Sequence, residues 1–212
     1  MDLLTELRTH RIVAIVRGDD ADAALRTVLT LGEENIPLIE VSLSGKEALG
    51  VIRRARATLS PTAPLGAGTV LTAPDARAVH EAGADFVVTP AVCEGITEAK
   101  RLELPVLAGV MPPTDIVAAR RLGADAFKIF PAAQAGGPAY LRALRGPFPA
   151  TPFVPVGGVD TEAAHEYLAH GATAVGVGPP LIGDAADGGS VDALRTRARA
   201  FRDAVHRPKR AA

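Results

Sequence analysis

The sequence predicts an α/β protein of the (β/α)8 TIM-barrel class, with a short helix before the first strand. Three observations lead to this prediction. Short, nearly continuous apolar runs occur eight times, as expected for strands buried in a parallel sheet. Each run is followed by a polar, alanine-rich segment of helical character. Several of these segments end in Gly-Ala just before the next apolar run. A doubly wound open sheet is the alternative, but no glycine-rich dinucleotide-binding turn is present.

The predicted strands share short apolar composition. They are Ile12–Arg17, Leu38–Leu43, Leu65–Val70, Phe86–Pro90, Val106–Val110, Ala126–Phe130, Phe153–Gly157 and Ala174–Gly178. The predicted helices are Leu3–Thr9, Ala21–Leu31, Lys46–Leu59, Pro74–Ala82, Thr114–Leu122, Ala139–Leu144, Thr161–Ala169 and Val191–Val205. We expect Thr72 and Asp160 to cap helix N-termini, and Gly83, Gly123 and Gly171 to end helices in the left-handed conformation.

Length and composition restrict the class of protein further. The 212 residues predict one domain spanning residues 1–212, with a flexible tail over about 207–212. A hydrophobic content of 48% argues against disorder, and a formal charge of -1 predicts no binding to nucleic acid or to an anionic membrane. Cys93 is the only cysteine, so no intrachain disulfide can form. No signal peptide or long apolar run is visible, and a soluble cytoplasmic protein is predicted.

Lys128 is the most informative residue, because every neighbour in its strand is apolar. Burial disfavours a charged ammonium group, and the neutral amine is the form that attacks a ketone or aldehyde. Alternation along the strands turns Lys128 into the barrel, and it does the same for Glu40 on the second strand. The second and sixth strands of such a barrel face each other, so the two side chains are expected to meet. A structural ion pair is the alternative interpretation.

The other predicted strand ends contribute few chemical groups. They carry Arg17-Gly18, Ser42, Gly68-Thr69, Thr89-Pro90, Phe130, Val156-Gly157-Gly158 and Gly178-Pro179-Pro180. The glycines after the seventh and eighth strands are typical of a backbone cradle for phosphate. All five histidines fall on helices or near helix ends, and Glu40 is the one carboxylate at the strand ends. This set predicts covalent lysine chemistry without a metal or cofactor.

Taken together, the ordered motifs resemble a known family. They are Ile39-Glu40-Val41, Gly66-Ala67-Gly68-Thr69-Val70, Val88-Thr89-Pro90, Phe127-Lys128-Ile129-Phe130-Pro131 and Val156-Gly157-Gly158-Val159. Over about residues 10 to 205 the chain resembles the class I aldolases of 2-keto-3-deoxy-6-phosphogluconate and its galactonate epimer, which are relatives of the 4-hydroxy-2-oxoglutarate aldolases.

The resemblance implies a Schiff-base lysine at Lys128 and a proton-transferring glutamate at Glu40. It implies a pyruvate pocket that includes the Gly68-Thr69 turn and Pro90, next to Phe130. It also implies a phosphate cradle from the last two barrel loops, here Val156, Gly157, Gly158 and Gly178. The expected reaction is cleavage of a 2-keto-3-deoxy-6-phospho sugar acid to pyruvate and glyceraldehyde 3-phosphate. The family forms trimers, so a homotrimer is expected by analogy.

Three departures from the gluconate-type pattern affect the expected substrate. The arginine that follows the strand-two glutamate in that pattern is replaced by Ser42-Leu43-Ser44, whereas Arg17-Gly18 matches the galactonate type. Val156 precedes the Gly-Gly pair, again as in the galactonate type. The serine usual in the last loop is replaced by Pro179, which lacks a hydroxyl and a backbone donor. We therefore expect a galactonate-type aldolase with Arg17 and Thr69 on the substrate carboxylate.

Three alternatives stay open at this point. The first is an aldolase of 4-hydroxy-2-oxoglutarate. The second is a sugar-phosphate isomerase or epimerase without a covalent intermediate, in which Lys128 and Glu40 act as simple acid and base. The third is a ligand-binding barrel without activity.

Overall fold

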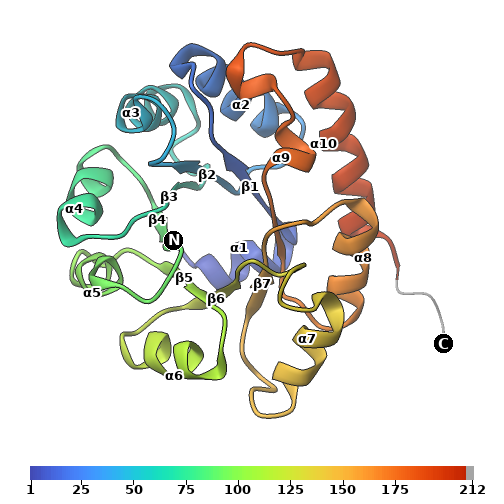
Figure 1. The fold of residues 1–212 in the computed structure, drawn as a ribbon. Helices are drawn as coiled ribbons and strands as arrows, with labels where there is room; N and C mark the ends of the chain where they lie inside the picture. The colour runs from blue at the N-terminus through green and yellow to red at the C-terminus, as the bar shows by residue number, and fades with distance from the viewer. Residues whose placement is uncertain (209–212) are drawn as a thin grey trace.

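The computed structural model describes residues 1–208, and the rest of the predicted flexible tail, 209–212, lies outside the described residues. At the start of that predicted tail, Arg207 pairs with Glu162 at 3.2 Å. Eight parallel strands alternate with helices (Figure 1). The strands are β1 (Ile12–Val16), β2 (Ile39–Ser42), β3 (Leu65–Gly68), β4 (Phe86–Val88), β5 (Val106–Val110), β6 (Ala126–Ile129), β7 (Phe153–Pro155) and β8 (Val175–Val177).

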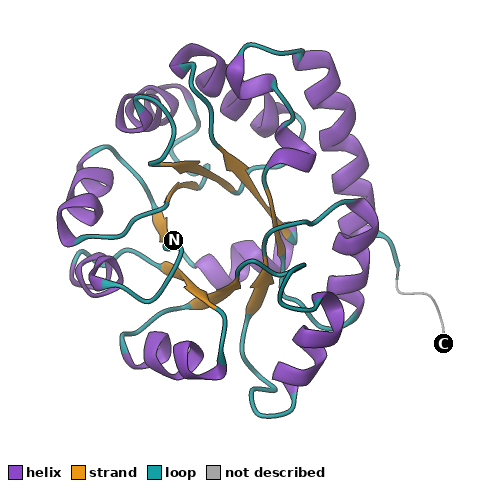
Figure 2. Cartoon of the chain, in the orientation of Figure 1, coloured by secondary structure: helices purple, strands orange, loops and turns teal. Residues whose placement is uncertain are grey.

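The strands form one sheet in the order β7-β6-β5-β4-β3-β2-β1-β8, with every pairing parallel. A single bridge between Val156 and Gly176 brings the two ends of the sheet together and closes the barrel. Figure 2 shows the helices around the outside of the ring of strands, apart from the N-terminal helix, which lies across the opening of the ring. The predicted (β/α)8 TIM barrel is confirmed.

The predicted strands extend one or two residues beyond most of the observed carboxyl ends. The backbone leaves the strand conformation there to form the loops that follow each strand. Thr69 has φ 61° and Gly157 has φ 100°, and neither value belongs to the β region. These residues therefore lie in loops at the mouth of the barrel.

The helices are α1 (Leu3–His10), α2 (Ala21–Glu33), α3 (Ala48–Thr58), α4 (Ala73–Glu81), α5 (Glu94–Arg101), α6 (Pro113–Arg121), α7 (Gly137–Arg145), α8 (Thr161–Ala169), α9 (Pro179–Ile182) and α10 (Val191–His206), with a 3-10 turn η1 (Ala185–Asp187). The predicted helices all form, with ends displaced by at most two residues. Three further elements, α5 and the short α9 and η1, were not among the predicted helices. Two prolines begin α9, and proline is tolerated only in the first turn of a helix.

The expected caps are present at both helix ends. The Thr72 hydroxyl accepts from the backbone N–H of Asp75, and the Asp160 carboxylate accepts from that of Ala163 at 2.8 Å. The glycines expected to end α4, α6 and α8 have φ values of 93°, 86° and 92° at Gly83, Gly123 and Gly171. Local sequence thus determines where these helices begin and end.

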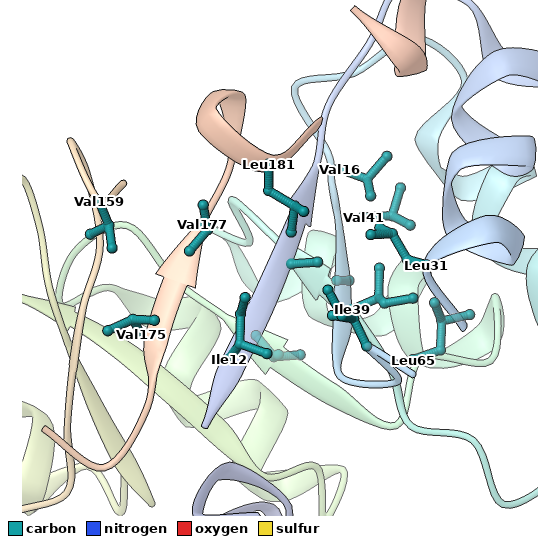
Figure 3. Packing of buried hydrophobic residues seen from close by; sticks show 14 of the residues in the cluster. Ile12, Val16, Leu31, Ile39, Val41, Leu65, Val159, Val175, Val177 and Leu181 are labelled. Carbon is teal, nitrogen blue, oxygen red and sulfur yellow. The ribbon is translucent and has the colours of Figure 1, made fainter. Parts of the chain in front are cut away.

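The apolar core has two layers, one outside the barrel and one inside it. The outer layer packs strand residues such as Ile39 and Val41 against helix residues such as Leu31 (Figure 3). Inside, Leu3 and Leu7 of α1 join the inward residues of the strands, among them Phe86. A Cβ on Gly66 would overlap the Phe86 ring, so glycine leaves space for that ring at the centre. Helix α1 covers the amino end of the barrel, and the carboxyl end is left for a cavity.

Within residues 1–208, no helix combines the length and the apolar composition needed to cross a membrane.

Candidate active site

Lys128 lies on β6 with its backbone in register with Gly109 of β5 and Val154 of β7. Only 7% of its surface is exposed, and its Nζ lies 5.3 Å from the centre of the Phe130 ring. The side chain of Lys128 forms neither a hydrogen bond nor an ion pair with any residue between 1 and 208. The neighbouring Phe127 and Ile129 belong to the outer core, as strand alternation predicts. The lysine amine therefore faces the barrel interior without a carboxylate in contact.

Glu40 faces the interior from β2 and is 2% exposed. A Cβ on Gly68, in the neighbouring strand, would lie 2.5 Å from the Glu40 carboxylate. Glycine at position 68 thus makes the space that the carboxylate occupies. Burial raises the pKa of Glu40 above its ordinary value, while the positive charges of Lys128 and then Arg17 pull it back down. A carboxyl group with a raised pKa is suited to both accepting and donating a proton.

A cavity of about 400 Å³ opens at the carboxyl end of the barrel. Every site residue predicted from the sequence lines it: Arg17, Glu40, Thr69, Pro90, Lys128, Phe130, Val156, Gly157, Gly158 and Gly178. Residues from β1, β2, β3, β4, β6, β7 and β8, or from the loops after these strands, therefore meet around one space. The cavity thus lies at the carboxyl end of the strands, where the active sites of TIM-barrel enzymes are found.

The wall of the cavity near β2 and β3 carries a chain of hydroxyl groups. The Thr69 hydroxyl lies 2.8 Å from that of Ser42, which lies 2.8 Å from that of Ser44. Ser42 is fully buried, Ser44 is exposed and Thr69 lines the cavity. Thr69 is held at φ 61°, an uncommon conformation for a β-branched residue, and such strain is frequent at functional sites.

The loop after β4 carries Pro90, which lines the cavity, and the hydroxyl of Thr89 holds this loop in place. The Thr89 side chain is fully buried, donates to the Ala91 carbonyl at 2.8 Å and accepts from the Gly109 N–H at 3.2 Å. A Cβ on Gly109 would overlap the Pro90 backbone, so glycine lets the two segments approach. Local hydrogen bonding thus fixes the Pro90 turn.

Several cavity residues were not predicted from the sequence. Ile15 and Gly176 could have been found by strand alternation, and Val159 by its position after the Gly-Gly pair. The others follow β8, in a segment for which no helix was predicted: Pro180, Ile182, Gly183 and Asp187, next to Pro179. Asp187 is an acid at the mouth of the barrel, whereas the sequence analysis expected Glu40 to be the only one.

Potential metal ligands do not gather within residues 1–208. No group of three or more His, Cys, Asp or Glu side chains is arranged to hold a metal ion there. The predicted positions of the histidines on helices or near their ends are confirmed, since His10, His80 and His165 lie in α1, α4 and α8, His170 follows α8, and His206 ends α10.

The fold and the cavity define the class of protein. A TIM barrel that encloses a buried lysine amine beside a carboxyl group with a raised pKa is typical of enzymes in which lysine attacks a carbonyl carbon.

Comparison with known proteins identifies the family. The family described as "Aldolase: KDPG and KHG aldolase" matches residues 3–194. A 2-dehydro-3-deoxy-phosphogluconate aldolase of Pseudomonas aeruginosa is 38% identical over 169 residues, 78% of this chain and 75% of that protein. The chain therefore belongs to the KDPG and KHG aldolase family, and it is a class I aldolase, hence a lyase.

Solved structures agree with this assignment. A native KDPGal structure is 31% identical, with a TM-score of 0.85 over 91% of this chain and 93% of that one. A KDPG aldolase of Legionella pneumophila is 27% identical, with a TM-score of 0.86 over 93% of this chain and 97% of that one. In that structure, pyruvate was captured as a covalent carbinolamine.

Proposed function

We propose that this chain cleaves a 2-keto-3-deoxy sugar acid by a retro-aldol reaction and releases pyruvate, with Lys128 as the covalent residue. The observation that carries the proposal is the pair Lys128 and Glu40, which are both buried and line the same cavity of about 400 Å³. With a 6-phosphorylated acid, the second product is glyceraldehyde 3-phosphate. The family membership supports an aldolase over the isomerase and the non-catalytic barrel.

The proposed reaction proceeds through an iminium ion. The neutral Lys128 amine adds to the C2 ketone to form a carbinolamine, which loses water. Glu40 supplies the proton that leaves with this water, and it then removes the proton of the C4 hydroxyl. The C3–C4 bond breaks, its electrons move to the iminium and form an enamine, and an aldehyde leaves. Protonation of the enamine at C3 and hydrolysis release pyruvate and restore the amine.

The remaining cavity residues bind the substrate in this proposal. Arg17 and Thr69 hold the C1 carboxylate, because a guanidinium and a hydroxyl are the donors on that wall. Pro90 and Phe130 pack against the pyruvate half. The Val156-Gly157-Gly158 segment and Gly178 surround the aldehyde half.

The configuration of the substrate at C4 is proposed to be galactonate-type. Arg17 and Val156 carry this choice, since both line the cavity and both match the galactonate-type pattern. Cleavage rates for the two C4 epimers test it, and equal or higher activity on the gluconate epimer contradicts it. The homotrimer expected from the resemblance stays a prediction, which sedimentation measures directly.

Borohydride trapping tests the covalent mechanism. Incubation with pyruvate and borohydride in the presence of EDTA should add one reduced pyruvate to the intact protein, on the peptide that contains Lys128. The Lys128→Ala variant is the control and should take up none. An unmodified wild-type protein, or an adduct on another lysine, contradicts the proposal.

A further inference from the structure

The segment that follows β8 forms one wall of the cavity, here called the distal wall: Gly178, Pro179, Pro180, Ile182, Gly183 and Asp187. In barrels of this class, phosphate is frequently held by the loops after β7 and β8 and by the N-terminus of a short extra helix. Helix α9 is a short helix at that position. The groups that the distal wall presents therefore decide how the aldehyde half of a substrate is recognised.

Helix α9 presents no backbone donor to the cavity. The first N–H groups of a helix are usually free to bind an anion. Here the first two positions, Pro179 and Pro180, have no N–H. The next two, Leu181 and Ile182, both donate to the Gly178 carbonyl at 2.9 Å, and Gly183 donates to that of Pro179 at 2.8 Å. From the sequence, only the backbone donor of Pro179 was expected to be missing. In the structure, no backbone N–H of α9 is available to a ligand.

Asp187 adds a negative charge to the same wall. One of its carboxylate oxygens accepts from the backbone N–H of Asp19 at 2.6 Å, which fixes η1 against the loop after β1. Asp187 pairs with no lysine or arginine of residues 1–208. A carboxylate repels a phosphate dianion, but it accepts hydrogen bonds from hydroxyl groups.

The two arginines near this wall, Arg197 and Arg17, bind other groups. Arg197, behind α9, donates to the carbonyls of Leu181 and Ile182 at 2.7 Å each and is not among the cavity residues. Arg17 is the one guanidinium lining the cavity within residues 1–208, and the proposed function assigns it to the C1 carboxylate. On the opposite side, the N–H of Gly158 donates to no backbone carbonyl of the described residues. The N–H of Gly178, just before α9, likewise donates to no such carbonyl. A phosphate would therefore meet backbone N–H groups of the β7 loop and of Gly178, but no donor of α9.

We propose that the distal wall selects an aldehyde half that is uncharged and carries hydroxyl groups over one that carries a phosphate or a carboxylate, with Asp187 as a specificity-determining residue. This inference rests on the proposed function and names its substrate class: unphosphorylated 2-keto-3-deoxy sugar acids. Asp187 accepts a hydrogen bond from a terminal hydroxyl of the substrate, and the two prolines remove from the wall the two helix donors that an anion would otherwise meet first.

Three substrates that share the pyruvate half test the inference: 2-keto-3-deoxygalactonate, its 6-phosphate and 4-hydroxy-2-oxoglutarate. The first has a neutral tail and the other two have anionic tails. We expect kcat/KM for pyruvate release to be at least tenfold higher for the neutral tail than for either anion. Equal or higher kcat/KM for the 6-phosphate overturns the inference.

Variants of the distal wall locate the cause. Asp187→Asn keeps the size of the side chain, removes the charge and should reduce the preference for the neutral tail at least fivefold, whereas Asp187→Glu should retain it. Asp184→Asn is the matched control, since this exposed acid lies in the same segment but outside the cavity. An equal change in Asp184→Asn, or none in Asp187→Asn, contradicts the role of Asp187.

Pro179→Ser provides an independent measurement, because it restores one N–H and adds a hydroxyl. The KM for the 6-phosphate should fall about tenfold relative to the KM for the neutral substrate; equal effects on both contradict the inference. The pyruvate adduct on Lys128 does not depend on the tail. Absence of that adduct refutes the proposed function, whereas an adduct with a preference for phosphate refutes only the present inference.

Discussion

The two ends of the barrel use acidic residues in opposite ways. At the amino end, Asp85 accepts from Arg56 and from the Leu65 N–H, both at 2.9 Å. Asp125 repeats the arrangement with Lys100 at 2.8 Å and the Val106 N–H at 2.7 Å. At the carboxyl end, Glu40 is more deeply buried than either, yet its carboxylate accepts no hydrogen bond from any residue between 1 and 208.

This difference separates groups that stabilise the fold from groups that are available to react. Each paired aspartate joins a helix to the start of a neighbouring strand, and its charge is satisfied in the folded protein. Burial destabilises the charged form of Glu40, and no hydrogen-bond partner compensates for this. The pKa of Glu40 is therefore raised. Proteins commonly accept such a cost where a substrate will supply the missing partner.

Replacing Lys128 should produce the largest effect. Lys128→Ala and Lys128→Arg should both abolish pyruvate release while the far-ultraviolet circular dichroism spectrum is preserved. Alanine has no amine, and arginine stays protonated and cannot form the imine. More than a trace of pyruvate release by a folded variant contradicts the covalent mechanism.

Replacing Glu40 should slow proton transfer without removing the nucleophile. We expect Glu40→Gln to form some adduct with pyruvate under borohydride and to lose roughly 10²–10⁴-fold in turnover. Steady-state kinetics with the preferred substrate measure this loss. Turnover at the wild-type rate would contradict the assignment of proton transfer to Glu40.

Stability measurements on matched amide variants compare the two ends directly. Asp125→Asn should lower the free energy of unfolding by about 1–2 kcal/mol, since it weakens hydrogen bonds of a charged, partly exposed carboxylate, and activity should be retained. A loss of activity as large as that of Glu40→Gln would contradict the assignment of the two ends.

The same comparison predicts that the contribution of Glu40 to the stability of the fold depends on pH. Because its pKa is raised in the folded protein, the folded state binds this proton more tightly than the unfolded state. This contribution to stability is complete below the ordinary pKa of 4.5 and is lost as the pH rises through the raised value. Glutamine does not titrate, so Glu40→Gln should gain stability relative to wild type as the pH rises above 4.5. Thermal unfolding across pH 5 to 8 measures this, and a constant difference would contradict the raised pKa.

Much of this molecule could be predicted from the sequence because its signals are local. Apolar runs predict the strands, Gly-Ala joints predict the helix ends, and period-two alternation places Lys128 and Glu40 in the barrel. The segment after β8 could not be predicted in this way. Its helix α9 has four residues and begins with two prolines. Asp187 lines the cavity, and its carboxylate accepts a hydrogen bond from the N–H of Asp19, which lies 168 residues earlier in the sequence. Likewise, no sequence pattern shows that Gly68 leaves space for the Glu40 carboxylate.

The smallest expected effect concerns the hydroxyl chain of Ser44, Ser42 and Thr69 beside the cavity. These hydroxyl groups extend the comparison, because they are proposed neither to stabilise the fold nor to take part in the chemical step. If Ser44 donates to Ser42 and Ser42 donates to Thr69, the Thr69 proton is directed away from the wall and toward the substrate carboxylate. Hydrogen bonds in such a chain strengthen one another.

Ser42→Ala removes the donor to Thr69, and the loss of about one neutral hydrogen bond should raise KM roughly fivefold, with kcat little changed. Ser44→Ala, at the exposed end, should change KM less than Ser42→Ala. Both variants should still form the pyruvate adduct on Lys128, at higher pyruvate concentration for Ser42→Ala. A fall in kcat with unchanged KM would show that Ser42 acts on the chemical step and not through the position of Thr69.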